Sequence, residues 1–289
     1  MIQSEERTLS VVDVAKETYL TFRTNLKQHA ILSYVFYLPF SLFLFVPGLS
    51  LTKHVAPGGN VTFQFSSAYL AFVAMAFLVT SALTLLFFRL HLLGCGNFLK
   101  FSLPDLGRML LKYILYLAAM IILLLIFMLV MTTGLGLVLS VISGVSGLDI
   151  APQGNRPLSL MIATIITIIT VGISFRMQIT FVSIAENRSF IPFREAWYYS
   201  RNNSLTIFTS LLLSVLPAWV FSMLLLNLLA GFFGITGTAM IDPAFIIVQY
   251  MLSPLILAPS SLFCCCMTRI YTRLVRTEDD KGHIADLIV

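Results

Sequence analysis

The chain has 289 residues, of which 58% are hydrophobic and 11% are charged, and its mean hydropathy is +0.93. Soluble domains carry about a quarter charged residues, so this composition excludes a free-standing soluble globule as well as disordered, collagen-like and disulfide-rich chains. We therefore expect an all-α, polytopic membrane protein. We attribute its formal net charge of +5 to membrane topology and contact with anionic lipid, and expect no nucleic-acid partner.

Residues 1–28 are expected to form a cytoplasmic amphipathic arm. Between Leu9 and Lys27, apolar side chains recur at spacings of three and four, which places them on one helix face. These side chains are Val11, Ala15, Tyr19, Phe22 and Leu26. The helix should lie along the inner leaflet before the chain turns into the bilayer.

Residues 29–267 are predicted to form six transmembrane helices arranged as three hairpins, followed by a cytoplasmic tail over residues 268–289. A helix needs about 20 apolar residues to cross the hydrocarbon core. Six stretches meet this length: His29–Leu51, Ala68–Phe88, Tyr113–Ile142, Leu158–Phe175, Leu205–Phe233 and Pro243–Met267. None of them shows the alternation of a lipid-facing barrel strand, which leaves helices.

The basic residues indicate the orientation of these spans. Sixteen of the 18 Lys and Arg residues fall in the N-terminal arm, the second and fourth connectors and the tail, and two fall in the other three connectors. Cytoplasmic loops are enriched in Lys and Arg, so both termini are predicted to be cytoplasmic. Short loops and the lack of any large soluble domain suit a bacterial inner membrane.

Two cytoplasmic connectors are predicted to contain short interfacial elbow helices that begin at a proline. Pro104 is followed by Asp105, and Pro192 is followed by Glu195. Proline is tolerated in the first helical turn, and an acidic residue there favours the positive end of the helix dipole. The elbows would feed the third and fifth spans.

Proline also interrupts the apolar spans. Pro217 and Pro254 fall near the middles of the fifth and sixth spans, where each leaves a backbone carbonyl without its helical donor. Two interpretations are open: kinks whose carbonyls are satisfied by neighbouring side chains, or a cavity between the two spans. Asn227 and Gln249 are the deepest polar residues and are predicted to hydrogen-bond each other.

No arrangement of catalytic residues is evident, so the chain is predicted to be non-enzymatic and to hold no cofactor or metal. All 13 acidic residues lie outside the span centres, which disfavours a proton-coupled transporter. Gly144-Val145-Ser146-Gly147 has the form of a rhomboid-protease nucleophile turn, but the last span supplies no histidine as base. Cys264–Cys266 are interpreted as small helix residues or, in a eukaryotic host, palmitoylation sites, and Asn60 as a glycosylation acceptor in such a host.

The cytoplasmic segment from Arg176 to Ser204 carries the clearest polar pattern. Arginines alternate there with aromatic residues, which is typical of a helix anchored at the membrane interface. We predict that polar residues of this segment and of the second connector contact lipid headgroups or a partner protein. The predicted residues are Arg89, Arg108, Arg176, Glu186, Arg194, Glu195, Ser200 and Arg201.

At this segment the chain resembles a loose family of six-span bacterial inner-membrane proteins. The family includes YciC-like proteins and the membrane domain of some glycerophosphodiester phosphodiesterases. The resemblance rests on Glu186 and Ser189 at the end of the fourth span and on Ala196 and Ser200 in the elbow, while Asn187 stands where glycine is expected. The resemblance implies a non-catalytic membrane protein. Our own prediction is that the protein binds anionic lipid headgroups, a protein partner or a second copy of itself, in membrane homeostasis or as a scaffold.

An alternative is the permease subunit of an ABC-type transporter. Such subunits carry a cytoplasmic Glu-Ala-Ala elbow that docks an ATPase, and Glu195-Ala196 is similar to its start. Trp197 replaces the second alanine of that pattern, and Arg201 replaces its glycine. Recovery of an ATPase subunit with the protein would distinguish the two interpretations.

Overall fold

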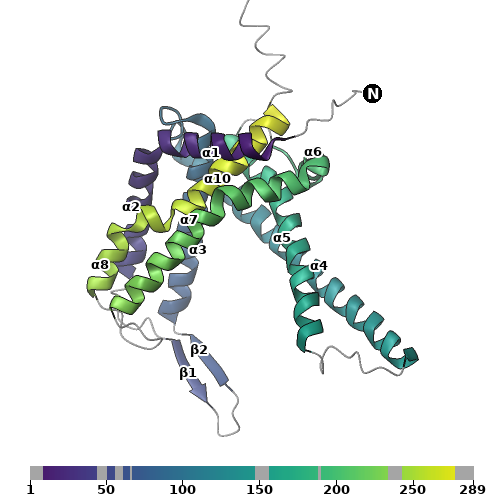
Figure 1. Ribbon diagram of the computed structural model, residues 1–289. Coiled ribbons are helices and arrows are strands. Elements are labelled where there is room, and N and C mark those ends of the chain that lie inside the picture. The colour runs from purple at the N-terminus through teal and green to yellow at the C-terminus, as the bar shows by residue number, and fades with distance from the viewer. Residues whose placement is uncertain are drawn as a thin grey trace, which may run out of the picture.

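The computed structural model describes residues 9–43, 51–55, 61–65, 67–146, 156–187, 190–233 and 243–276. The long helices are α2 (Leu26–Phe43), α3 (Ser67–Leu93), α4 (Leu103–Ser146), α5 (Arg156–Glu186) and α7 (Ser204–Phe232). The shorter elements are α1 (Val11–Thr24), α6 (Phe193–Tyr199), η1 (Arg201–Asn203), α8 (Pro243–Met251), α9 (Ser253–Ile256), α10 (Ala258–Tyr271) and η2 (Thr272–Arg276). One end of the molecule carries α1 and α6 (Figure 1).

Four helical stretches are long and apolar enough to cross a membrane. They are Tyr69–Leu93, Leu103–Gly134, Met161–Glu186 and Arg201–Phe232, and they overlap the predicted second, third, fourth and fifth spans, with ends that differ by up to eleven residues. This confirms a helical, multi-pass architecture by length and hydropathy. The predicted first span is described as α2 up to Phe43, and the predicted last span is divided into α8, α9 and α10.

The helix boundaries differ from the prediction at the polar ends. The expected elbow at Pro104 is not a separate helix, because α4 runs without a break from Leu103 through the third span. Its start is fixed by a reciprocal cap, in which the Ser102 amide donates to Asp105 and the Asp105 amide donates to the Ser102 hydroxyl, both at 3.3 Å. The elbow at Pro192 does form a helix of its own, α6.

Two short strands add a hairpin to the expected all-helical fold. The strands β1 (Leu51–Val55) and β2 (Val61–Phe65) pair antiparallel, with Leu51 opposite Phe65 and Val55 opposite Val61. β-Branched and aromatic residues favour strands, and the intervening Pro57-Gly58-Gly59-Asn60 sequence contains the residue types that favour turns. Figure 1 shows the hairpin at the end of the molecule opposite α6.

The N-terminal helix α1 is confirmed, but its buried face was predicted only in part. The Ser10 side chain caps it by accepting from the Asp13 amide at 3.4 Å. Val14, Ala15 and Thr18 are buried, and α1 contacts α7 and α10. The face of Val14, Ala15 and Thr18 therefore packs against protein, whereas an interfacial helix on its own would present its apolar face to lipid.

The core lies where the helices cross near α1 and α6. Its largest buried side chains come from the last turns of α3, the second half of α5 and α10, and include Phe87, Phe88, Phe181, Met267 and Tyr271. Toward the opposite end α4 and α5 diverge from α3 and α7 (Figure 1), and α4 exposes Leu, Ile and Met side chains along this length. In a bilayer such side chains face lipid tails, so their exposure has no hydrophobic cost.

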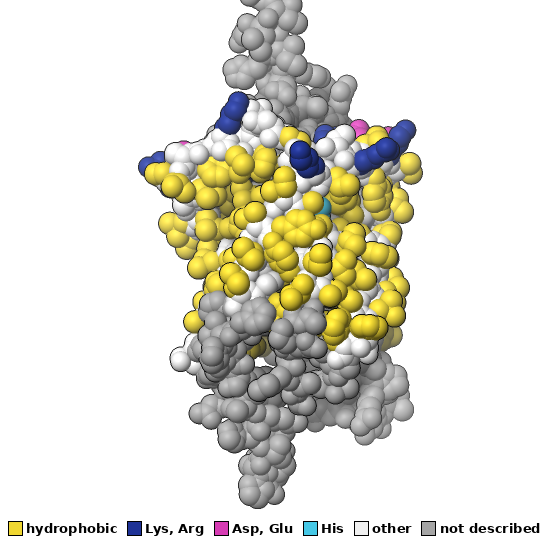
Figure 2. Space-filling view, turned by 90° about the vertical axis from the view of Figure 1, so that its left-hand side faces the viewer, with side chains coloured by type: hydrophobic (Ala, Val, Ile, Leu, Met, Phe, Trp, Pro, Cys, Tyr) yellow, Lys and Arg dark blue, Asp and Glu magenta, His cyan; other side chains and the backbone are white. Residues whose placement is uncertain are grey.

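Basic and apolar surfaces are separated along the molecule. Figure 2 shows one face, on which hydrophobic side chains cover the body and Lys and Arg side chains stand along its upper edge. We call this end, where α1 and α6 lie, the basic end. Its exposed cations are Lys16, Arg23, Lys27, Lys100, Arg108, Lys112, Arg194 and Arg201.

The backbone carbonyl that Pro217 leaves without its helical donor accepts a hydrogen bond from a side chain of α1. Proline at 217 cannot donate to the carbonyl of Leu213 one turn earlier. The Tyr19 hydroxyl donates to the carbonyls of Leu213 at 3.1 Å and Ser214 at 3.0 Å. Partial burial raises the pKa of Tyr19 above its ordinary value. Of the two interpretations of this proline, the packed kink is therefore correct.

We expect Tyr19→Phe to lower the stability of the protein by about 1 kcal/mol, because it leaves the Leu213 carbonyl without a donor. Pro217→Ala supplies a backbone donor to the same carbonyl. In the Pro217→Ala background, Tyr19→Phe should therefore cost less. Thermal unfolding of the four proteins in detergent measures the coupling, and equal costs in both backgrounds would show that the hydroxyl does not act on the kink.

Candidate functional site

The predicted contact residues gather at the basic end, but only some of them are free to meet a ligand. Arg108, Arg194, Glu195 and Arg201 are exposed, whereas Arg89, Glu186 and Ser200 are buried and Arg176 is half-buried. The exposed residues come from α4, α6 and η1. The buried residues tie the ends of the helices to one another and so position the exposed ones.

Arg176, in the second half of α5, fixes the elbow helix to α5. Its guanidinium carbon lies 3.5 Å from the centroid of the Trp197 ring. Its Nε donates to the Ser200 hydroxyl at 3.0 Å, and its second terminal nitrogen donates to the Trp197 carbonyl at 2.8 Å. Stacking and hydrogen bonding thus act together, and they require the planar guanidinium group of arginine.

The elbow packs one face inward and turns the other outward. Ala196 is fully buried, and the Ser200 hydroxyl donates to the Ala196 carbonyl at 2.8 Å. Glu195 and Arg194 stay exposed and, with Tyr198 and Tyr199, line a shallow pocket of about 280 Å³. The two residues that resemble the permease elbow therefore have different roles, since the alanine packs into the core and the glutamate faces outward.

Arg89 is a buried cation held by backbone carbonyls. Its side chain is 4% exposed, and it donates to the carbonyls of Phe98 at 3.0 Å and Ala185 at 2.8 Å. The guanidinium also lies 5.1 Å from the centroid of the Phe101 ring. Because Ala185 belongs to the last turn of α5, the cation meets the negative end of that helix dipole. Arg89 therefore joins α3, α5 and the connector after α3.

Glu186 is likewise occupied within the protein. Its carboxylate accepts a hydrogen bond of 2.6 Å from the Tyr271 hydroxyl, and the side chain is 8% exposed. This bond joins the end of α5 to the end of α10. Ser189, the other residue of the family-like pattern at this point, lies outside the described residues.

Asn187 ends α5 with a left-handed backbone. Its φ is 59°, a conformation that favours glycine and that asparagine tolerates better than most other residues. Its amide donates to the Ser183 carbonyl at 3.3 Å. Asn187, which replaces the glycine of the family-like pattern, therefore has a backbone conformation that both asparagine and glycine can adopt.

The last predicted span is a broken helix whose carbonyls are satisfied by other helices. Pro259 cannot donate to the carbonyl of Leu255, and the Ser222 hydroxyl of α7 donates to it at 2.9 Å. On the α2 side, Nε2 of His29 lies 2.8 Å from the Pro254 carbonyl, and the Tyr34 hydroxyl donates to the Met251 carbonyl at 3.1 Å. A carbonyl can only accept, so His29 carries its hydrogen on Nε2.

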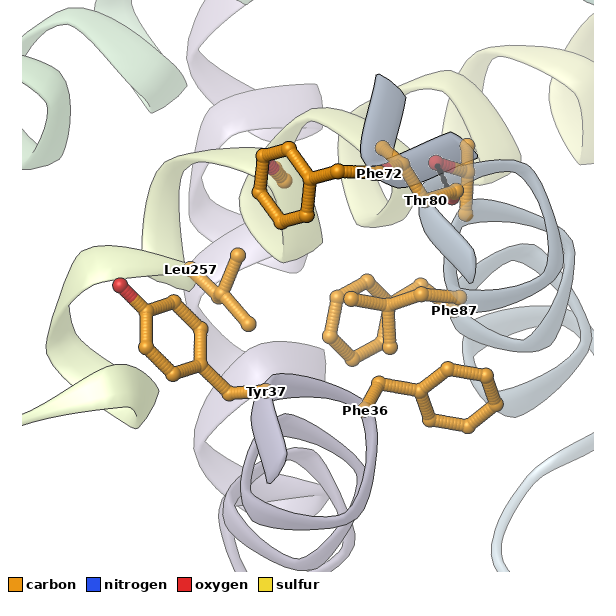
Figure 3. A pocket seen from close by; sticks show the side chains of 9 residues that line it. Phe36, Tyr37, Phe72, Thr80, Phe87 and Leu257 are labelled. Carbon is orange, nitrogen blue, oxygen red and sulfur yellow. Dashed lines mark hydrogen bonds between the residues drawn. The ribbon is translucent and has the colours of Figure 1, made fainter. Parts of the chain in front are cut away.

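A pocket of about 250 Å³ lies beside this break, between α2, α3 and the junction of α9 with α10. Figure 3 shows Phe36, Tyr37, Phe72, Phe87 and Leu257 around a central space. The remaining lining residues are Thr80, Leu83, Thr84 and Ser260. Leu257 forms the bend between the two helices.

Sequence reasoning did not identify the donors to the broken helix or the pocket. Tyr19, His29, Tyr34 and Ser222 were visible only as polar residues on apolar helices, and which carbonyl each reaches depends on the packing of distant segments. The predicted bond between Asn227 and Gln249 is wrong: Asn227 donates to the Met223 carbonyl at 2.9 Å, while Gln249 accepts from the Tyr37 hydroxyl at 3.3 Å.

The three consecutive cysteines serve as packing residues. Cys264, Cys265 and Cys266 are at most 1% exposed. The Cys265 thiol lies 3.4 Å from the Thr18 carbonyl of α1. Their burial leaves no surface at which an acyl group could be attached without opening the core.

We expect Arg176→Ala to destabilise the protein by about 1–2 kcal/mol, because it removes both the stacking and the charge-assisted hydrogen bonds of the elbow. Arg201→Ala, which removes an exposed charge of the same elbow, should have little effect on stability. Trp197 fluorescence in a Trp219→Phe background reports the elbow directly, and Arg176→Ala should make it easier to quench with acrylamide. Equal effects of Arg176→Ala and Arg201→Ala on stability and on quenching would contradict the role of Arg176 in holding the elbow.

Comparisons with protein-family models, with curated proteins and with solved structures find no match to this chain. The resemblance to YciC-like proteins therefore stays a prediction. The function of the chain is therefore inferred from its own residues, above all from which polar side chains at the basic end are exposed and which are buried.

Proposed function

We propose that the chain is a non-catalytic, six-span protein of a bacterial inner membrane, with both termini in the cytoplasm, and that its basic end binds anionic lipid headgroups. One observation carries the proposal: exposed Lys and Arg side chains gather at the end where α1 and α6 lie, above an apolar body (Figure 2). Each Lys or Arg close to an anionic leaflet contributes about 1 kcal/mol of attraction.

The inner residues of the basic end have a positioning role in this proposal. Arg176 holds the elbow, so the neighbouring Arg194 and Arg201 are presented at a fixed place. Arg89 and Glu186 join the helix ends beneath that surface. Headgroup contact is therefore assigned to exposed residues of α4, α6 and η1, with Arg108, Arg194 and Arg201 as its main cations.

The orientation can be tested with a native residue. Cys95 is exposed in the connector between α3 and α4, while the other three cysteines are buried. We expect a membrane-impermeant maleimide to label Cys95 only after cells are permeabilised. Asn60→Cys should be labelled in intact cells. Labelling of Cys95 in intact cells would reverse the topology and contradict the cytoplasmic placement of the basic end.

Lipid preference tests the functional part of the proposal. Protein purified in mild detergent should retain phosphatidylglycerol in preference to phosphatidylcholine, as counted by native mass spectrometry, and high salt should weaken the preference. Replacing Arg108, Arg194 and Arg201 by alanine should abolish most of it. Lys53 and Arg156 lie in the predicted outer connectors, so their replacement by alanine is the matched control. Unchanged retention in the triple variant would refute headgroup binding.

The permease alternative is supported by one feature, the exposed Glu195 beside the shallow pocket of α6. A subunit of that kind would be isolated with an ATPase in fixed proportion, and Glu195→Gln would weaken the association. Recovery of lipid without such a subunit favours the headgroup proposal.

A further inference from the structure

The pocket beside the broken helix lies at bilayer depth. Its lining residues on α3 run from Phe72 to Phe87, inside the candidate span Tyr69–Leu93. At 1.5 Å per residue this stretch covers about 22 Å along the helix. Thr80 and Ser260 are the exposed residues of the lining, on α3 and α10. One wall of the pocket therefore follows α3, and the pocket reaches the molecular surface where Thr80 and Ser260 are exposed.

The pocket offers little to a polar ligand. The nine lining residues include no charged side chain (Figure 3). The Thr84 hydroxyl donates to the Thr80 carbonyl at 2.8 Å, and the Tyr37 hydroxyl donates to Gln249 at 3.3 Å. A polar group that entered would lose its hydration without finding these donors, which is unfavourable. An apolar chain gains contacts with four aromatic rings and loses nothing.

From this geometry we infer that the pocket binds an acyl chain of a membrane phospholipid. Hydrocarbon chains are the solvent at this depth, and an unfilled apolar space would cost its walls their dispersion contacts. Leu257 links the pocket to the bend between α9 and α10. A bound chain therefore fills the space that the bend leaves against α2 and α3. This site is separate from the basic end and takes the tail of a lipid, whatever its headgroup.

Photocrosslinking in vesicles tests the inference. The full chain is reconstituted in phosphatidylcholine that contains a small share of phosphatidylcholine with a photoreactive group on one acyl chain. Crosslinks mapped by peptide mass spectrometry should be enriched at the pocket residues of α2, α3 and α10 over the exposed face of α5 near Ile165 and Ile168. Similar yields at both places would show ordinary surrounding lipid only and would overturn the proposal.

Two substitutions at the opening of the pocket provide a second test of the inference. Thr80→Phe on α3 and Ser260→Phe on α10 each place a ring at the opening of the pocket, and both residues are exposed, so the core is left intact. Each should lower pocket crosslinking about tenfold, which corresponds to about 1.4 kcal/mol. Thr167→Phe, at an exposed threonine of α5, is the matched control and should leave pocket crosslinking unchanged.

The outcomes separate this site from the proposed headgroup surface. The vesicles contain no anionic lipid, so enrichment at the pocket does not depend on the cations of the basic end. Loss of anionic lipid retention in the triple arginine variant, with pocket crosslinking intact, would support both assignments. Unchanged crosslinking in both Thr80→Phe and Ser260→Phe would refute the pocket alone.

Discussion

A backbone carbonyl that a helix break exposes at bilayer depth must find its donor inside the protein, because lipid tails supply none. Pro217 and Pro259 each create such a carbonyl, and each receives a hydroxyl from another helix, Tyr19 in one case and Ser222 in the other. The donors come from segments far apart in the chain. These hydrogen bonds therefore hold α1, α7 and α9 in one arrangement, since moving any of them would leave a carbonyl unsatisfied.

The same requirement explains the buried arginine. Arg89 lies among the ends of α3 and α5 without a described carboxylate partner, and it is stabilised by the Ala185 carbonyl at the end of α5 and by the Phe98 carbonyl in the connector after α3. The described ion pair between Arg273 and Glu17 is by contrast half-exposed, and such pairs contribute about 0–1 kcal/mol. The basic end is thus organised mainly by side chains that donate to backbone.

Apolar length and charge asymmetry were sufficient to predict the helical class, four of the spans and the elbow at Pro192, because these depend on local sequence. They could not separate Arg89 from Arg176, although both follow a phenylalanine at a predicted span end. One proves buried and the other stacks on a tryptophan. That difference is set by which connector folds over each arginine, and periodicity carries no information about it. The same holds for the donors of the broken helix.

The position of the donors also determines where an apolar ligand can bind. His29 and Tyr34 of α2 contact carbonyls of the broken helix, whereas Phe36 and Tyr37 of the same helix line the pocket. Ser222 approaches from α7. Since these donors satisfy the carbonyls of Met251, Pro254 and Leu255, just before the bend at Leu257, the bend needs no water at those carbonyls, and its remaining face can be apolar. Without these donors, the carbonyls at the break would need water in a hydrated cavity. With the donors in place, the pocket beside the break can bind hydrocarbon.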